Sequence, residues 1–197
     1  MEQDEIQQWV TALGHPDSEV RLEARRQLAG AGAAALDQLA EAMKSPIPAV
    51  SYAATCLVAE MEHPRHFDLM VEMLASPNLL AAEVAAGALR RYGGRAVAPL
   101  AAALPNCQPV VQVSIVHSLE MIGSREAVRP LMDLLVSTGY DTLRYTIIQA
   151  LGTIGDPSAA ELVRQYQDDA NHHVRERARR ALEQLRAVSG SPNYTTP

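Results

Sequence analysis

Residues 17–28 read DSEVRLEARRQL, and residues 174–182 read VRERARRAL. In each stretch Val, Ala and Leu recur every four residues, which places them on one face of an α-helix. The same pattern recurs along the chain, and its third apolar position falls at Leu28, Val58, Leu89, Leu119, Leu151 and Leu182, with spacings of 30, 31, 30, 32 and 31 residues. The sequence therefore predicts a helix that is repeated about every 31 residues.

A second helix is predicted after each of the first five. Its apolar anchors are Leu39, Leu69, Leu100, Leu131 and Leu162. Most turns between the two helices contain Gly, which suits a left-handed C-cap, and Pro157 suits the first position of a new helix. Between pairs, Asp17, Asn78 and Asn171 stand where an N-cap acceptor is wanted. No stretch alternates with a period of two, so no sheet is predicted.

A helix pair of this size cannot bury its apolar side alone, so such pairs stack into arrays. We expect an all-α fold, a right-handed α-solenoid (superhelix) of about six short antiparallel HEAT-like helix pairs. It is expected to fill a single domain over residues 1–188. That domain has a half-repeat cap at about 4–14, repeats that start near residues 17, 47, 78, 108 and 141, and a last helix over 172–187. Residues 189–197 lack periodicity and are expected to form a flexible tail.

The two opening stretches and the segment ALGTIGDPSAA at residues 150–160 resemble the short HEAT-like repeats of phycobilisome lyase subunits. The resemblance covers about residues 4–187. Repeats two to four depart from the family's Val-Arg pair, with Val50-Ser51, Ala81-Ala82 and Val111-Gln112, which predicts a weaker ladder of arginines there. Relatives act as scaffolds, as helpers in bilin attachment or chlorophyll-related steps, and as metal-dependent hydroxylases, so the resemblance implies a fold and not one function.

Composition excludes several classes of protein. The 197 residues carry a net charge of −6, which disfavours nucleic-acid binding. No apolar run approaches the roughly 18–20 residues that cross a bilayer. The start of the chain is acidic, unlike a signal peptide. Cys56, expected to be buried, and Cys107, at a corner, are isolated thiols that fit a reducing compartment. We expect a cytoplasmic protein without a membrane segment.

Catalytic signatures are also missing. There is no nucleophile elbow, phosphate-binding loop or dinucleotide fingerprint, so we expect no enzyme and no cofactor. The six histidines lack the His-Glu dipeptides with which HEAT-like hydroxylases hold iron, so we expect no metal and solvated turn histidines. The arginines of the last helix are expected to cap the array rather than bind phosphate. A monomer is expected, with weak head-to-tail association as the alternative.

The second helices are expected to line the concave side, where solenoids usually bind partners. Residues two before and two after each anchor point outward, as do Gln7 and Thr11 of the first helix. The predicted contacts are Asp37, Glu41, Phe67, Val71, Ala98, Ala102, Arg129, Asp133 and Arg164. Phe67 is either an outward hot spot or, with the register shifted by one, a core residue.

The predicted function is a scaffold or adaptor that binds a protein partner on this strip. A lyase-like or chaperone helper, which handles a tetrapyrrole chromophore or its carrier protein, stays as the alternative. A nucleic-acid binder is the third interpretation, and the acidic residues at the start of the strip disfavour it.

Overall fold

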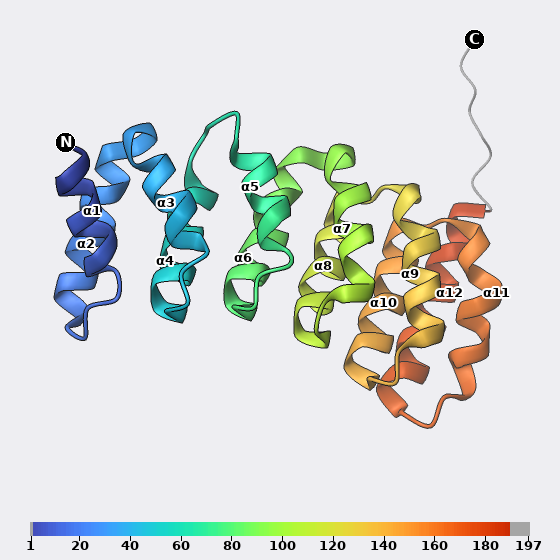
Figure 1. Cartoon of the computed structure of the whole chain (residues 1–197). Helices are drawn as coiled ribbons and strands as arrows, with labels where there is room; N and C mark the ends of the chain where they lie inside the picture. Colours follow the sequence, from blue (N-terminus) through green and yellow to red (C-terminus); the bar gives the residue numbers. More distant parts are fainter. Residues whose placement is uncertain (1, 190–197) are drawn as a thin grey trace, which may run out of the picture. The chain divides into compact units, whose positions relative to one another are not determined.

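A computed structural model describes residues 2–189, in which α-helices and short 3₁₀ helices are joined by turns and no strand is present (Figure 1). The α-helices are α1 (Gln3–Ala12), α2 (Ser18–Ala31), α3 (Leu36–Met43), α4 (Pro48–Glu60), α5 (His66–Met73), α6 (Leu79–Leu89), α7 (Val97–Ala103), α8 (Pro109–Ile122), α9 (Val128–Ser137), α10 (Asp141–Ile154), α11 (Ala160–Arg164) and α12 (His172–Ser189). The 3₁₀ helices are η1 (Gly32–Ala35), η2 (Arg90–Ala96), η3 (Leu104–Asn106), η4 (Arg125–Ala127), η5 (Pro157–Ala159) and η6 (Gln165–Asp168). The prediction of an all-α solenoid is confirmed.

Contacts divide the chain into two compact units, Met1–Tyr92 and Gly93–Pro197. The single domain expected over residues 1–188 stays a prediction. The flexible tail expected at residues 189–197 lies outside the described residues, except that Ser189 is the last residue of α12.

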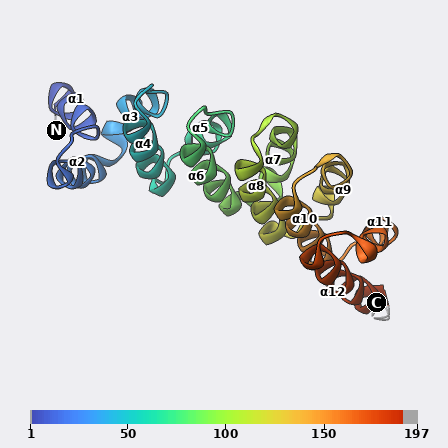
Figure 2. The same cartoon turned by 90° about the horizontal axis from the view of Figure 1, so that it is seen from below.

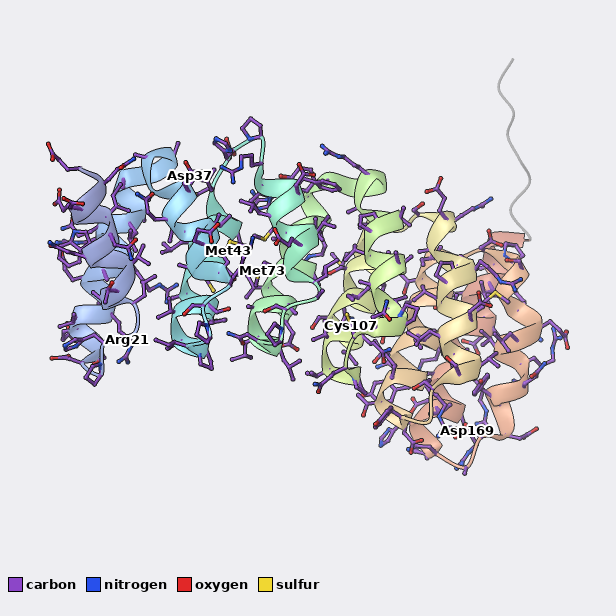
Figure 3. All side chains as sticks on the ribbon, in the orientation of Figure 1. Arg21, Asp37, Met43, Met73, Cys107 and Asp169 are labelled. Atoms are coloured by element: carbon purple, nitrogen blue, oxygen red, sulfur yellow. The ribbon has the colours of Figure 1, made fainter. Side chains whose placement is uncertain are left out.

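Each unit consists of two layers of helices (Figure 2). In the first unit α4 packs between α2 and α6, while α1 and α3 pack side by side in the other layer. In the second unit α10 packs between α8 and α12, and α9 and α11 cover this layer from one side. The buried Met43 and Met73 lie inside the first unit (Figure 3).

The repeat predicted from the sequence sets the core. All six aligned residues from Leu28 to Leu182 are at most 3% exposed, and the residues four positions earlier are also buried. The second-helix anchors Leu39, Leu69, Leu100 and Leu131 are buried as well. The fifth anchor is wrong by one position, because Val163 is fully buried and Leu162 is half-buried. Val163 lies four residues after the buried Ala159, as Leu131 does after Ala127 and Leu100 after Ala96.

Two glycines provide the predicted left-handed C-caps. Gly123 and Gly155 have φ of 70° and 74°, and their amides donate to the carbonyls of Leu119 and Leu151. The N-cap prediction holds in part. Asp17 and Asn171 accept hydrogen bonds from backbone amides two residues on, but Asn78 accepts none. Its side-chain amide donates instead to the carbonyl of Pro48, 2.8 Å away in the preceding repeat.

In four of the six repeats, the side chain after the first Val position hydrogen-bonds to the backbone that precedes the helix. Arg21 donates to the carbonyls of His15 and Pro16, Ser51 to Met43, Gln112 to Leu104, and Arg175 to Asp169 and Ala170, over 2.7–2.9 Å. In the fifth repeat, Arg144 pairs instead with the carboxylates of Asp141 and Asp169. The ladder was expected to weaken in repeats two to four. It does so at Ala82, which has no donor, whereas Ser51 and Gln112 each reach a carbonyl eight residues earlier. Such bonds satisfy the acceptors left open where a helix ends.

Candidate partner-binding surfaces

Most of the second-helix residues that were predicted to point outward are exposed to solvent. Asp37, Glu41, Ala98, Ala102, Arg129, Asp133 and Arg164 are exposed, and Phe67 and Val71 are half-buried. Some of these charges are paired within their own unit. Asp37, labelled in Figure 3, pairs with Arg65 of the turn between α4 and α5, and Arg129 pairs with Asp133 on α9. Whether a partner binds these residues stays a prediction.

In the second unit α10 packs against α8 and α12, whereas α7, α9 and α11 pack mainly against helices of that layer. The strip residues of α7, α9 and α11 thus lie in the other layer. Whether this layer forms a concave side stays a prediction.

In the first unit, part of the predicted strip lines a hollow. The hollow measures about 320 Å³ and lies between α1 and α3; we call it the α1–α3 hollow. It is lined by Gln7, Val10, Thr11, Gln38, Glu41, Ala42, Ser45, Ile47 and Val50. Its apolar floor is formed by Val10, Ala42 and Val50, each at most 7% exposed, and Ile47 stands at its edge, 53% exposed.

Glu41 is the charged residue of this hollow. Lys44 is one turn away, but its ammonium pairs with Glu72 at 2.9 Å. Within the described part of the chain, no cation lies within ion-pair distance of the Glu41 carboxylate, although the charge of Lys44 also acts on it at longer range. The α1–α3 hollow therefore combines an apolar floor with one exposed carboxylate at its edge.

Glycine occurs in the turns after α2, α6, α8 and α10, but not in the turn after α4. Side-chain hydrogen bonds hold this turn instead. His66 is fully buried, and its Nε2 lies 3.2 Å from the carbonyl of Ala59. That carbonyl accepts a second hydrogen bond, from Arg91 Nη2 at 2.7 Å. Because a carbonyl only accepts, Nε2 carries the proton and Nδ1 accepts from the Tyr92 hydroxyl, 2.7 Å away. The expectation of solvated turn histidines is wrong here.

Phe67 belongs to the same cluster. Its ring meets that of Tyr92 edge to face, with 4.9 Å between the centroids. The two alternatives for Phe67 therefore resolve into an intermediate position: the ring is half-buried against Tyr92 rather than fully outward or in the core. The sequence signal that marks this cluster is the missing glycine in the turn at His63-Pro64-Arg65.

Stability of the first unit should fall in mild acid because of His66. Burial lowers the pKa of His66 below 6.5, and Arg91 adds to this effect, while the hydrogen bond to Ala59 opposes it. His66 is therefore protonated near pH 6.5 in the unfolded chain, but only at a lower pH in the folded chain. The loss begins as the pH falls through 6.5 and ends at the lower, folded pKa, with a slope of at most about 1.4 kcal/mol per pH unit.

Urea unfolding between pH 7.5 and pH 5 measures this slope, for the wild type and for His66→Gln. The variant should be less stable at pH 7.5 and should lose less stability on acidification. His15→Gln, at an exposed corner, is the control and should keep the wild-type slope. Identical slopes for all three proteins would contradict the role given to His66.

The arginines of the last helix differ in exposure, and whether they only cap the array stays a prediction. Arg179 and Arg186 are exposed, but Arg177 is half-buried and lines a hollow of about 390 Å³ with Tyr145, His173, Glu176 and Arg180. We call it the α10–α12 hollow. Arg180 forms an ion pair with Glu176, one turn earlier. Arg177 makes no ion pair with a described residue.

The two cysteines lie in different units and both are half-buried. Cys56 was expected to be buried, but it is half-buried on one side of α4, where its thiol interacts with the hydroxyl of Tyr52, one turn earlier. Burial raises the pKa of the Cys107 thiol (Figure 3). Among residues 2–189, His, Cys, Asp and Glu do not gather in threes that could hold a metal ion. Nor does any described helix have the length and apolar character to cross a membrane. The expected absence of a metal stays a prediction.

Solved structures share this arrangement of helices. An engineered protein is similar over 95% of this chain and 98% of its own, with 22% identity and a TM-score of 0.56. The complex of CpcE and CpcF of phycocyanin lyase from Nostoc sp. PCC7120 is similar over 76% of this chain and 64% of that chain, with 23% identity and a TM-score of 0.60. A designed armadillo repeat protein is similar over 91% of this chain and 99% of its own, with 17% identity and a TM-score of 0.52.

Identities this low show the fold alone. Among curated proteins, none matches the chain. The family model of HEAT repeats matches residues 6–90 and 97–183, which together make up most of the sequence. Because this family model covers far more than half of the sequence, the chain belongs to the family of HEAT-repeat proteins.

Proposed function

We propose that this chain is a non-catalytic scaffold or adaptor that binds a segment of a partner protein in the α1–α3 hollow. The observation that carries the proposal is the chemistry of this hollow: an apolar floor bordered by the exposed carboxylate of Glu41, which forms no salt bridge with a described residue. A partner segment with an apolar side chain next to Lys or Arg complements both features. Asp37, Phe67 and Val71 extend the contact along the first unit.

The polar residues of the hollow support a peptide ligand. The side chains of Gln7 and Gln38 border it, and amide groups can pair with the backbone of an extended segment. Ile47 is 53% exposed at the edge of the hollow, and a bound partner side chain would remove its apolar surface from water. The exposed strip residues of the second unit, Ala98, Ala102, Arg129, Asp133 and Arg164, stay predicted contacts of a larger partner.

The test starts with a partner recovered from native lysate and identified by mass spectrometry. Binding of the purified partner is then compared for Glu41→Lys and for Glu19→Lys. Both glutamates are exposed helix residues of the first unit, but Glu19 lies outside the hollow. Glu41→Lys should weaken binding about tenfold or more, mainly by slowing association and changing its salt dependence.

Glu19→Lys should leave the affinity within about twofold. Equal effects of the two substitutions would exclude the α1–α3 hollow as the docking site. The variant Ile47→Asp adds a second readout, because loss of the apolar contact should speed dissociation at any salt concentration.

The α10–α12 hollow favours a second candidate function, a helper that handles a tetrapyrrole or its carrier protein. Linear tetrapyrroles carry propionate carboxylates, and Arg177, His173 and Tyr145 present cationic and hydroxyl donors to one open hollow. The similarity to the phycocyanin lyase complex is compatible with it. Visible absorbance on titration with biliverdin separates the candidates: a saturable spectral change that Arg177→Ala abolishes would favour the helper.

A further inference from the structure

A second hollow in the first unit differs from the α1–α3 hollow in chemistry. It measures about 330 Å³, lies between α2 and α4, and is lined by Leu13, Ser18, Arg21, Leu22, Arg25, Ala49, Tyr52 and Ala53. We call it the α2–α4 hollow. Leu22 is 63% exposed at its edge and Tyr52 is 37% exposed. Two large apolar side chains thus meet around one surface depression, where water contacts both.

The charges of this hollow have one sign. Arg21 and Arg25 are its ionisable groups besides the phenol of Tyr52, and no carboxylate lines it. Arg21 is held in place, because its Nη1 donates to the carbonyls of His15 and Pro16 at 2.7 and 2.8 Å, which leaves its positive charge unneutralised. The guanidinium of Arg25 makes no ion pair within the described residues.

Arg25 and Arg26 are neighbours with different roles. Arg26 pairs with Glu23 at 2.9 Å and takes no part in the hollow. Arg25 lies near Tyr52: the hydrogen bond with Cys56 raises the pKa of Tyr52, and the positive charge of Arg25 acts against that rise. Arg25 thus lines the hollow without an ion-pair partner among the described residues, whereas its neighbour Arg26 is held in a surface ion pair.

We infer that the α2–α4 hollow is a docking site for a protein segment in which an apolar side chain is flanked by Asp or Glu. Leu22, Ala49 and Tyr52 receive the apolar side chain, and the flanking carboxylates pair with Arg25 and Arg21. The charge requirement is opposite to that of the α1–α3 hollow, so the two sites select different segments. The first unit then joins two partners, or two parts of one partner, which goes beyond a single docking site.

Selection from a random peptide library displayed on phage tests this inference. The wild-type chain is the bait, and the Arg25→Glu variant removes peptides that bind elsewhere. The enriched peptides should carry Leu, Ile or Phe flanked by Asp or Glu. A synthetic peptide made from the enriched sequence should bind Arg25→Glu and Leu22→Glu about tenfold or more weakly than the wild type.

Two matched controls accompany these variants. Arg26→Glu makes the same charge change one residue along α2, and Leu80→Glu replaces another exposed leucine of the first unit, 58% exposed and outside the hollow. Both should bind the peptide within about twofold of the wild type. Circular dichroism should show the same helical signal for all four variants, because each changes an exposed side chain.

Several results would overturn the inference. Enriched peptides without acidic residues, removal of all wild-type binders by the Arg25→Glu variant, or equal effects of Arg25→Glu and Arg26→Glu would each do so. A dimer in sedimentation experiments that Leu22→Glu dissociates would assign the hollow to a second copy of the chain. Binding to phosphatidylserine vesicles that needs Arg25 would assign it to a lipid surface. The test with Glu41→Lys is independent of all of these.

Discussion

Leu151→Ala should lower the free energy of unfolding by about 2–5 kcal/mol, the range for a buried leucine whose removal leaves a cavity. Leu151 is fully buried in α10, which packs between α8 and α12 and also contacts α9. With neighbours on three sides, little can move into the space that the side chain leaves. Unfolding by urea, followed by circular dichroism, measures the loss.

The matched substitution is Leu182→Ala at the same repeat position in α12. Helix α12 is the last helix of the described chain and packs against α10 and α11. It can therefore shift inward to fill part of the cavity, and the expected loss is smaller. A loss from Leu182→Ala equal to or greater than that from Leu151→Ala would contradict the packing order of the second unit.

Gly152→Ala should also destabilise the second unit, although alanine is the better helix former. A Cβ at Gly152 would lie 2.8 Å from both the Cα and the Cβ of Ala181, closer than such atoms approach. The backbones of α10 and α12 must therefore separate. We expect a loss of about 1–3 kcal/mol, the usual effect of overfilling a packed interior.

Gly87→Ala in α6 is the control. A Cβ there meets no atom within 4 Å, so only the helix propensity changes, and stability should rise by about 0.5–1 kcal/mol. Thermal and urea unfolding of both variants measure the change in the free energy of unfolding, which should be a loss for Gly152→Ala and a gain for Gly87→Ala. If Gly152→Ala stabilised the chain as Gly87→Ala does, the close contact of α10 with α12 would be refuted.

The hydrophobic periodicity predicted the fold well because the spacing of apolar residues follows directly from which helix face is buried. Helices α2, α4, α6, α8, α10 and α12 each begin within about one residue of the predicted start, and Asp17, Asn78 and Asn171 directly precede three of them. The fifth anchor was misplaced by one residue because the repeat before it is the longest, with 32 residues from Leu119 to Leu151, and the buried position of the second helix moves with it to Val163. Asn78 was assigned a capping role from its position, but its amide faces a carbonyl thirty residues earlier, which a local pattern does not encode.

The binding surfaces were predicted less well. Outward positions such as Glu41 follow from the helical period, but a hollow depends on how far apart two helices lie. Leu22 and Arg25 were not singled out, because nothing in the sequence relates them to Tyr52 in the next repeat, with which they line one hollow. The buried His66 was missed for a similar reason: its partners come from α4 and from the turn after α6.

Hydrogen exchange of the complex with the purified partner tests the central claim most directly, that a partner segment docks in the α1–α3 hollow. The account predicts slower exchange in α1, in α3 and in the segment around Ile47 when the partner is bound. It also predicts that Glu41→Lys removes this protection at the same partner concentration. Protection confined to the second unit, or unchanged by Glu41→Lys, would contradict the account.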